Sequence, residues 1–460
     1  MYHINFNKPC NIYFIGIGGI SMSGLAEILL KEGFHVSGSD SKESSLTDHL
    51  TALGASIVYD QSISHIPDDT DVVVYTAAIH PDHPEITDAA QRCIPLLTRA
   101  ELLGQLMRNY KTAVNIAGTH GKTTTTSMVT EILLAADTDP TISVGGILPT
   151  IGGNIRVGNS GLFVTEACEY TNSFLSFWPT VEVILNIEAD HLDFFKDIDD
   201  IRHSFRLFME KLPKDGLLVI NSDIPQLTQL TQGLECRIVT VGHDAASNYR
   251  ALNIEYNEFA QASFDVSGPD DSLLGHIQLS VPGEHNVYNA LAAIALCLNL
   301  GLSMESIAQG LYNFHGTQRR FEKKGVVNGV TIIDDYAHHP QEISATLTAA
   351  KKYPHNKIWC IFQPHTYTRT KALLHDFADS LSLADEVVLA KIYPARETDD
   401  LGISSDNIRA LLEAHGTNAH YLETFEEIEK FILNNTVPGD LLITMGAGDV
   451  VKIGENLISL

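Results

Sequence analysis

Short apolar runs that suit buried strands alternate with helix-length amphipathic stretches along almost the whole chain. This alternation predicts strand–helix units with largely parallel sheets, because two parallel strands need a long crossover between them, which is usually a helix. Helices are predicted at Met22–Lys31 and within Gly283–Leu300, and Asn248–Ser280 is predicted to form antiparallel strands and turns. The strands predicted from apolar runs are Asn11–Ile15, His35–Gly38, Thr112–Ala117, Leu162–Thr165, Val181–Asn186, Val330–Ile333, Ile358–Phe362, Glu386–Lys391 and Leu441–Thr444.

The length of the chain indicates several domains. Its 460 residues exceed the ~250–300 residues beyond which a single hydrophobic core stops growing. We place the domain joins near Tyr110 and Gly316, which predicts domains over residues 1–110, 111–316 and 317–460.

The balance of charge excludes two classes of partner. Lys and Arg together number 30 and Asp and Glu 57, which gives a net charge of −27. A surface this acidic repels phosphate backbones and anionic lipid, so we expect neither a nucleic acid nor a membrane as partner. The longest apolar segment, Ala290–Leu298, is too short to cross a bilayer, so we expect the protein in the cytoplasm.

The strongest chemical signal is the segment Gly118–Thr124, which follows a predicted strand and opens a predicted helix. It is a shortened variant of the phosphate loop, because its two glycines are three positions apart instead of the usual five. Backbone N–H groups at a helix N-terminus bind phosphate, the Lys122 ammonium can reach the terminal phosphates, and the Thr123 hydroxyl can bind Mg²⁺. The segment therefore predicts a nucleoside triphosphate site.

Two further residues follow strands of the same block. Glu166 ends an apolar run, where a parallel sheet presents ligand-binding groups, and its carboxylate suits Mg²⁺. His191 is a less usual magnesium ligand, since Mg²⁺ prefers oxygen, and by residue chemistry alone the adjacent Asp190 is an equal candidate.

A second glycine loop lies near the start of the chain. Gly16, Gly18 and Gly19 stand between a predicted strand and a predicted helix, and Ser39 and Asp40 follow about 20 residues later, as in dinucleotide-binding folds. A serine replaces the third glycine of that pattern. The loop suits a pyrophosphate, which NAD and a UDP-sugar both carry.

Polar residues in the last block are predicted to open onto one cleft, because they follow two parallel strands. Tyr336 and His338 come after one strand, and His365 and Arg369 come after another. The histidine spacing fits no standard zinc pattern, which favours hydrogen bonding. Arg369 can bind a carboxylate bidentately, as an amino-acid substrate requires, and Arg320 at the domain join is predicted to reach phosphates.

Eight segments taken together, in this order along the chain, resemble the Mur ligase family. They are GIGGISMSGLAEIL (from Gly16), GTHGKTT (from Gly118), EACEY (from Glu166), NIEADHLDFF (from Asn186), GEHNVYNALAA (from Gly283), GTQRRFE (from Gly316), DDYAHHP (from Asp334) and FQPHTYTRT (from Phe362).

The resemblance implies an α/β fold with a Rossmann-like N-terminal domain, a central P-loop ATPase-like domain and a C-terminal Rossmann-like α/β domain. It also implies a ligase of peptidoglycan precursor synthesis, with ATP and Mg²⁺ as cofactors. In the branch of the family that this chain resembles, L-alanine is joined to the lactyl carboxylate of UDP-N-acetylmuramate through an acyl phosphate. We expect a monomer or a homodimer.

Each predicted role rests on a matched position. The expected catalytic residues are Lys122, Glu166, His191 and Arg320. The expected ATP contacts are Gly118, Thr119, His120, Gly121, Lys122, Thr123, Thr124, Asn286, Asn289, Arg320 and Asp335. The expected metal ligands are Thr123, Glu166 and His191. The expected UDP-sugar contacts are Gly16, Gly18, Gly19, Ser39 and Asp40, and the expected amino-acid contacts are Tyr336, His338, His365 and Arg369.

Two departures from the family pattern stand out. Where several related ligases carry a modified lysine, this chain has the segment His203–Phe208 without lysine, which fits the alanine-adding branch. Thr366 stands where a basic residue is expected beside the alanine site. Three alternatives stay open: a related ligase that attaches a whole peptide, an NAD-dependent dehydrogenase, and a nucleotide-binding regulator without activity.

Overall fold

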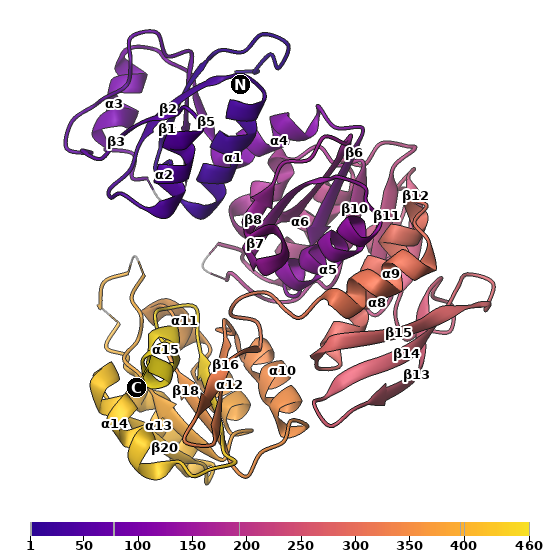
Figure 1. Ribbon diagram of the computed structural model, residues 1–460, viewed down its shortest axis with the longest axis vertical. Helices are drawn as coiled ribbons and strands as arrows, with labels where there is room; N and C mark the ends of the chain where they lie inside the picture. The colour runs from indigo at the N-terminus through magenta and orange to yellow at the C-terminus, as the bar shows by residue number, and fades with distance from the viewer. Residues whose placement is uncertain (1, 77–78, 193, 396, 400, 460) are drawn as a thin grey trace. The chain divides into compact units, whose positions relative to one another are not determined.

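The computed structural model describes residues 2–76, 79–192, 194–395, 397–399 and 401–459. Asp193, in the family segment from Asn186, lies outside them. The chain divides into two compact units, each described by itself below (Figure 1). The first unit comprises Met1–Ser247 and Ala295–Gly301, and the second comprises Asn248–Ile294 and Leu302–Leu460.

The first unit begins with a five-stranded parallel sheet in the order β3-β2-β1-β4-β5. The order reverses between β1 and β4, so the glycine loop after β1 lies at the switch point where such sheets bind ligands. The strands are β1 Asn11–Ile15, β2 His35–Ser39, β3 Ser56–Val58, β4 Val72–Tyr75 and β5 Leu96–Thr98. The helices are α1 Ile20–Lys31, α2 Ser45–Ala52, α3 Pro84–Gln91 and α4 Arg99–Met107.

The same unit contains a seven-stranded sheet in the order β12-β11-β10-β6-β9-β7-β8, in which β7 and β8 pair antiparallel. The phosphate loop follows β6, between the ends of β10 and β9. The strands are β6 Thr112–Ala117, β7 Thr141–Leu148, β8 Gly153–Arg156, β9 Leu162–Ala167, β10 Val181–Ile184, β11 Leu217–Asn221 and β12 Arg237–Val241. The helices are α5 Lys122–Ala135, η1 Pro149–Ile151, η2 Tyr170–Ser176, α6 Ile198–Met209 and α7 Leu227–Thr231.

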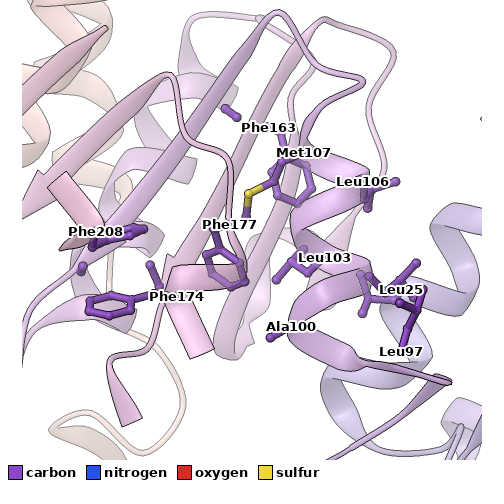
Figure 2. Close-up of a cluster of buried hydrophobic side chains, with 14 of the residues drawn as sticks. Leu25, Leu97, Ala100, Leu103, Leu106, Met107, Phe163, Phe174, Phe177 and Phe208 are labelled. Carbon is purple, nitrogen blue, oxygen red and sulfur yellow. The ribbon is translucent and has the colours of Figure 1, made fainter. Parts of the chain in front are cut away.

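One hydrophobic cluster runs through both sheets of this unit. Figure 2 shows it where Leu103, Met107 and other residues of α4 lie beside Phe163 and Phe177 of the central block. The backbones approach closely here, since a Cβ at Gly104 would lie 1.9 Å from the carbonyl oxygen of Ser176. Burial of these side chains therefore holds the N-terminal sheet against the central one.

The second unit contains two sheets. A three-stranded antiparallel sheet of β13 Arg250–Tyr256, β14 Gln261–Ser267 and β15 Leu273–Pro282 confirms the prediction for this stretch. A six-stranded sheet has the order β16-β17-β21-β18-β19-β20, with only β16 antiparallel among these described strands. Its strands are β16 Glu322–Val327, β17 Val330–Asp335, β18 Ile358–Phe362, β19 Glu386–Leu389, β20 Asn418–Tyr421 and β21 Leu441–Met445.

Helices accompany both sheets of the second unit. The helix α8, His285–Asn299, continues from this unit into residues of the first. The others are α9 Met304–Asn313, α10 Pro340–Lys351, α11 Tyr367–Ala372, α12 Leu374–Leu381, α13 Ser405–Ala414, α14 Phe425–Asn435 and α15 Val451–Ser459.

The predicted α/β fold is confirmed, with differences at strand ends. Glu166 and Asp335 lie inside their strands, because β9 pairs with β6 as far as Ala167 and β17 pairs with β21 as far as Asp335. The strand β10 ends at Ile184 instead of Asn186. The domain joins near residues 110 and 316 stay predictions. Among the described residues, no helix combines the length and the apolar character needed to cross a bilayer.

Candidate functional site

The phosphate loop leaves β6 at Gly118 and enters α5 at Lys122. Gly118 has a backbone φ of 146° and Gly121 one of 86°, values that residues with a Cβ rarely adopt. A Cβ on Gly118 would also lie 3.2 Å from the backbone nitrogen of Asn186. Both glycines are therefore needed for the shape of the loop.

A second segment, which follows β10, braces this loop. The backbone N–H of His120 donates to Oδ1 of Asn186 at 2.8 Å, and Nδ2 of Asn186 donates back to the His120 carbonyl at 3.0 Å. The backbone N–H of Glu188 donates to Oγ1 of Thr119 at 2.9 Å, and its carboxylate lies 3.6 Å from Nε2 of His120. Neither Asn186 nor Glu188 was assigned a role from sequence, although both lie in a family segment.

Lys122 folds back into the loop. Its Nζ donates to the carbonyl oxygens of Gly118 and Thr119 and to Oε2 of Glu169, at 2.5, 3.0 and 3.0 Å. Burial would lower the pKa of Lys122, but Glu169, together with the nearby Cys168 and Glu166, outweighs it and raises the pKa above its ordinary value. The ammonium is therefore charged. Glu169 is a third residue of this site for which the sequence predicted no role.

Two of the three expected metal ligands lie together. The Thr123 hydroxyl donates to Oε2 of Glu166 at 3.0 Å, and the backbone N–H of Gly145 donates to Oε1 at 2.5 Å. A Cβ on Gly145 would lie 2.6 Å from that carboxylate. Only glycine at this position leaves enough room for the Glu166 side chain. A hydroxyl and a carboxylate at the end of a phosphate loop are oxygen ligands of the kind Mg²⁺ prefers, so the residues fit this ion.

His191 occupies a different environment. Its ring stacks on Tyr170 at a centroid distance of 4.5 Å, and its Nε2 lies 3.8 Å from Oδ2 of Asp190. Its φ of 52° is in the left-handed region. The described part of the chain contains no group of three or more His, Cys, Asp or Glu residues arranged to hold a metal. His191 as a ligand therefore stays a prediction.

The first glycine loop is held by its own acidic residue. Oδ2 of Asp40 accepts from the backbone N–H of Gly18 at 2.7 Å, and Gly16, with φ 78°, donates its N–H to the Ser39 carbonyl at 2.8 Å. The Ser39 hydroxyl is fully buried and donates to Oε2 of Glu85 at 2.6 Å. Asp40 thus shapes the loop. Gly19 is the N-cap residue of α1, and the backbone N–H groups at this helix N-terminus suit a pyrophosphate.

In the second unit, Arg320 and Asp335 lie at the carboxyl end of β17. Oδ2 and Oδ1 of Asp335 accept from the backbone N–H groups of Phe321 and Ala337, both at 2.8 Å. Burial raises the pKa of Asp335 to about 6, although Arg320 opposes this. The guanidinium of Arg320 lies over the Tyr336 ring, 5.3 Å from its centroid.

Glu342 and Arg319 support these residues and were missed from sequence. Glu342 at the start of α10 lies 3.9 Å from Arg320 and accepts from the backbone N–H of His338. His339 and Glu342 form a capping box at the start of α10, but histidine is not among the N-cap residues by which such a box is recognised from sequence. Arg319 bonds to buried Asp334 at 3.0 Å, so it stabilises the loop before β16.

The expected amino-acid residues gather at the ends of β17 and β18. The rings of His338 and His365 are 6.0 Å apart, and His365 stacks on Tyr393. Burial, together with His338 and Arg369, lowers the pKa of His365 to about 4. Burial also lowers the pKa of His338, against the opposing effect of a nearby carboxylate. This cluster therefore combines two neutral imidazoles with a guanidinium.

The remaining expected ATP contacts lie at the starts of two helices. Asn286 and Asn289 are both buried at the start of α8, where Nδ2 of Asn289 donates to Oδ1 of Asn286 at 3.1 Å. Thr124 lies in the first turn of α5. Thr366, which replaces the expected basic residue, has φ 67° and precedes α11.

Comparison with known families covers nearly the whole chain. Residues 11–111 match the Mur ligase family catalytic domain, residues 116–297 match the Mur ligase middle domain, and residues 319–448 match the Mur ligase glutamate ligase domain. The chain belongs to the Mur ligase family. A three-domain Mur ligase architecture agrees with the α/β prediction.

Individual Mur ligases are similar over their full length. Two relatives described as UDP-N-acetylmuramate–L-alanine ligase, from Lachnospira eligens and Agathobacter rectalis, are each 61% identical, and each alignment covers all of both chains. The solved structure of UDP-N-acetylmuramate-alanine ligase from Thermotoga maritima has a TM-score of 0.81 at 31% identity, and covers 98% of each chain. A murein peptide ligase from Psychrobacter arcticus has a TM-score of 0.73 at 26% identity, and also covers 98% of each chain.

Proposed function

We propose that this Mur ligase joins L-alanine to the lactyl carboxylate of UDP-N-acetylmuramate, with ATP as the energy source, in peptidoglycan precursor synthesis. The observation that carries the proposal is the phosphate loop. There the Lys122 ammonium donates to a carbonyl oxygen of the loop, and the Thr123 hydroxyl donates to the Glu166 carboxylate. The 61% identity to full-length relatives of that name supports the choice of substrates.

The three domains divide the substrates between them. Residues 1–110 bind the UDP-sugar through the loop at Gly16, Gly18 and Gly19. Residues 111–316 bind ATP, and residues 317–460 bind the amino acid.

The first step creates an activated acid. The lactyl carboxylate attacks the γ-phosphate of ATP, the bond from that phosphorus to the β–γ bridging oxygen breaks, and an acyl phosphate and ADP result. Lys122 and the loop N–H groups stabilise the negative charge that builds between two anions, and Arg320 adds a cation for the phosphates. Preorganised cations matter here because the reacting groups would otherwise repel each other.

Mg²⁺ is part of the proposal. The Thr123 hydroxyl and the Glu166 carboxylate would hold it, with His191 at a second metal position, and the ion would supply additional positive charge to the phosphates. Glu166 is already oriented for this role by the backbone N–H of Gly145.

The second step forms the amide. Arg369 binds the carboxylate of alanine, and the neutral imidazoles of His338 and His365 accept hydrogen bonds from its amino group without repelling it. The uncharged amine attacks the acyl carbon and forms a tetrahedral oxyanion. As this intermediate collapses, the bond from the acyl carbon to the phosphate oxygen breaks, and the proton lost from the nitrogen leaves with the phosphate. The guanidinium groups of Arg319 and Arg320 both lie over the Tyr336 ring, which holds this ring in place beside the proposed alanine site.

A substrate-omission assay tests the proposal. ADP release by the purified protein is measured with ATP and Mg²⁺, and UDP-N-acetylmuramate and L-alanine are left out in turn. We expect turnover only with both. Preferential use of a tripeptide over L-alanine would identify a peptide ligase instead. Reduction of NAD with an alcohol would point to a dehydrogenase, and nucleotide binding without turnover to a regulator.

The setting of the reaction follows from its substrates. ATP and a nucleotide-sugar are intracellular metabolites, so we place the enzyme in the cytoplasm. We expect a monomer or a homodimer, which sedimentation at several concentrations would distinguish.

A further inference from the structure

One member of a buried ion pair beside the phosphate loop, Glu169, has no part in the reaction proposed above. Glu169 follows β9, the strand that carries Glu166, and only 2% of its side chain is exposed. Its carboxylate lies 3.0 Å from the ammonium of Lys122, whose side chain is only 16% exposed. Each charge loses most of its hydration, so removal of either residue would leave the other charge buried without compensation.

Lys122 uses all of its donors inside the protein. An ammonium has three N–H groups, and the bonding partners of Nζ are the carbonyls of Gly118 and Thr119 and the Glu169 carboxylate. A phosphate oxygen can therefore reach the ammonium only by replacing one of these partners. Of the three, only Glu169 carries a full negative charge, the same sign as the phosphate.

We propose that Glu169 is a positioning residue that competes with the phosphates of the nucleotide for Lys122. It holds the ammonium in the loop of the empty site, gives it up when ATP binds, and takes it back as ADP leaves. The inference rests on the proposed function, because it treats Lys122 as a phosphate ligand. Its consequence is that Glu169 weakens nucleotide binding and speeds product release.

The test compares ADP affinity and turnover in Glu169→Gln with the wild-type protein. Glutamine keeps the size and an acceptor oxygen but removes the charge, so the competition with phosphate is lost. We expect the Kd for ADP, measured by calorimetry with and without Mg²⁺, to fall at least fivefold. We expect kcat and the KM for ATP to fall together, because slower release of ADP limits turnover.

A double-mutant cycle separates this role from a structural one. In the Lys122→Met background, Glu169→Gln should lower the Kd for ADP by much less than it does in the wild-type background, because no ammonium remains to be shared. Glu386→Gln is the matched control, since Glu386 is also a largely buried glutamate paired with a lysine, Lys357, at 2.8 Å. It should leave the Kd for ADP unchanged.

Glu169→Asp keeps the charge and guards against a variant that does not fold. Its shorter side chain lengthens the contact to Lys122, so we expect the Kd for ADP to fall about twofold to threefold. An unchanged Kd in both Glu169 variants, with wild type binding ADP, would overturn the inference and leave the proposed function standing. So would binding that weakens only with Mg²⁺, which would make Glu169 a metal ligand. No nucleotide binding by wild type would overturn the proposed function itself.

Discussion

Replacement of Gly104 by alanine perturbs the contact between the first two sheets. Gly104 lies in α4, and a Cβ there would lie 1.9 Å from the carbonyl oxygen of Ser176, 2.8 Å from its carbonyl carbon and 3.3 Å from Cα of Phe177. All three atoms belong to the backbone of the facing segment, so no side-chain rotation relieves the clash. The helix α4 must move away from η2.

The magnitude follows from two opposing effects. Alanine in place of glycine stabilises a helix interior by about 1 kcal/mol. Overpacking of a well-packed core costs about 1–3 kcal/mol, and we expect the upper end of that range because the apolar cluster of Figure 2 must open. The net loss is therefore about 2 kcal/mol, or roughly 4–8 °C in the Tm of a unit of this size.

Thermal unfolding followed by circular dichroism measures the effect, with Gly24→Ala as the matched control. A Cβ on Gly24 would meet Ile155 at Cδ1 (1.4 Å), Cγ1 (2.4 Å) and Cβ (3.0 Å), all of them side-chain atoms, and the two nearest can move by side-chain rotation without a backbone shift. Gly24→Ala should therefore lower the Tm by less than Gly104→Ala. A Gly104→Ala protein that melts at or above the wild-type temperature would refute the reasoning.

Three other predictions concern the sites. Lys122→Ala should abolish ligation and leave the Kd for UDP-N-acetylmuramate unchanged in calorimetry; equal loss of both in a folded variant would contradict separate sites. Arg369→Ala should raise the KM for alanine about 10- to 100-fold, as loss of a charge-assisted hydrogen bond implies, and a selective loss of ATP affinity would disprove its assignment. Burial raises the pKa of Asp335 from 3.8 to about 6, so ionisation costs the folded state about 3 kcal/mol between those pH values. Wild type should lose stability to urea as pH rises from 4 to 6, and Asp335→Asn should show a smaller loss.

The strands and the phosphate loop could be predicted because their signals are local. Thr112–Ala117 and Ile358–Phe362 are apolar runs bounded by polar residues, and the structure places β6 and β18 at these positions. Two glycines followed by Lys122 and Thr123, placed between a strand and a helix, form a pattern that is typical of phosphate loops. In each case, neighbouring residues along the chain hold all the information needed.

The partners of those residues could not be predicted, because they come from distant segments. Asn186 bonds to a loop residue 66 positions earlier, and Glu169 pairs with a lysine 47 positions earlier. By sequence, Gly104 is only a poor helix former. The structure explains why glycine stands there, because the Ser176 carbonyl oxygen occupies the space that a Cβ would need. The ends of strands could not be predicted either. The strand β9 continues through Glu166 because it pairs with β6 there, and this pairing is not visible in the sequence.

The two hydrogen bonds between Asn186 and His120 make the side-chain amide behave like an extra peptide unit supplied by the segment that follows β10. A loop with two fewer residues between its glycines thereby gains a donor and an acceptor without added chain length. Its shape is settled before any ligand arrives, so binding loses little backbone entropy. The affinity of this loop for nucleotide is thus in part a property of the residue that follows β10, and grafting the loop alone onto another sheet would not carry it over.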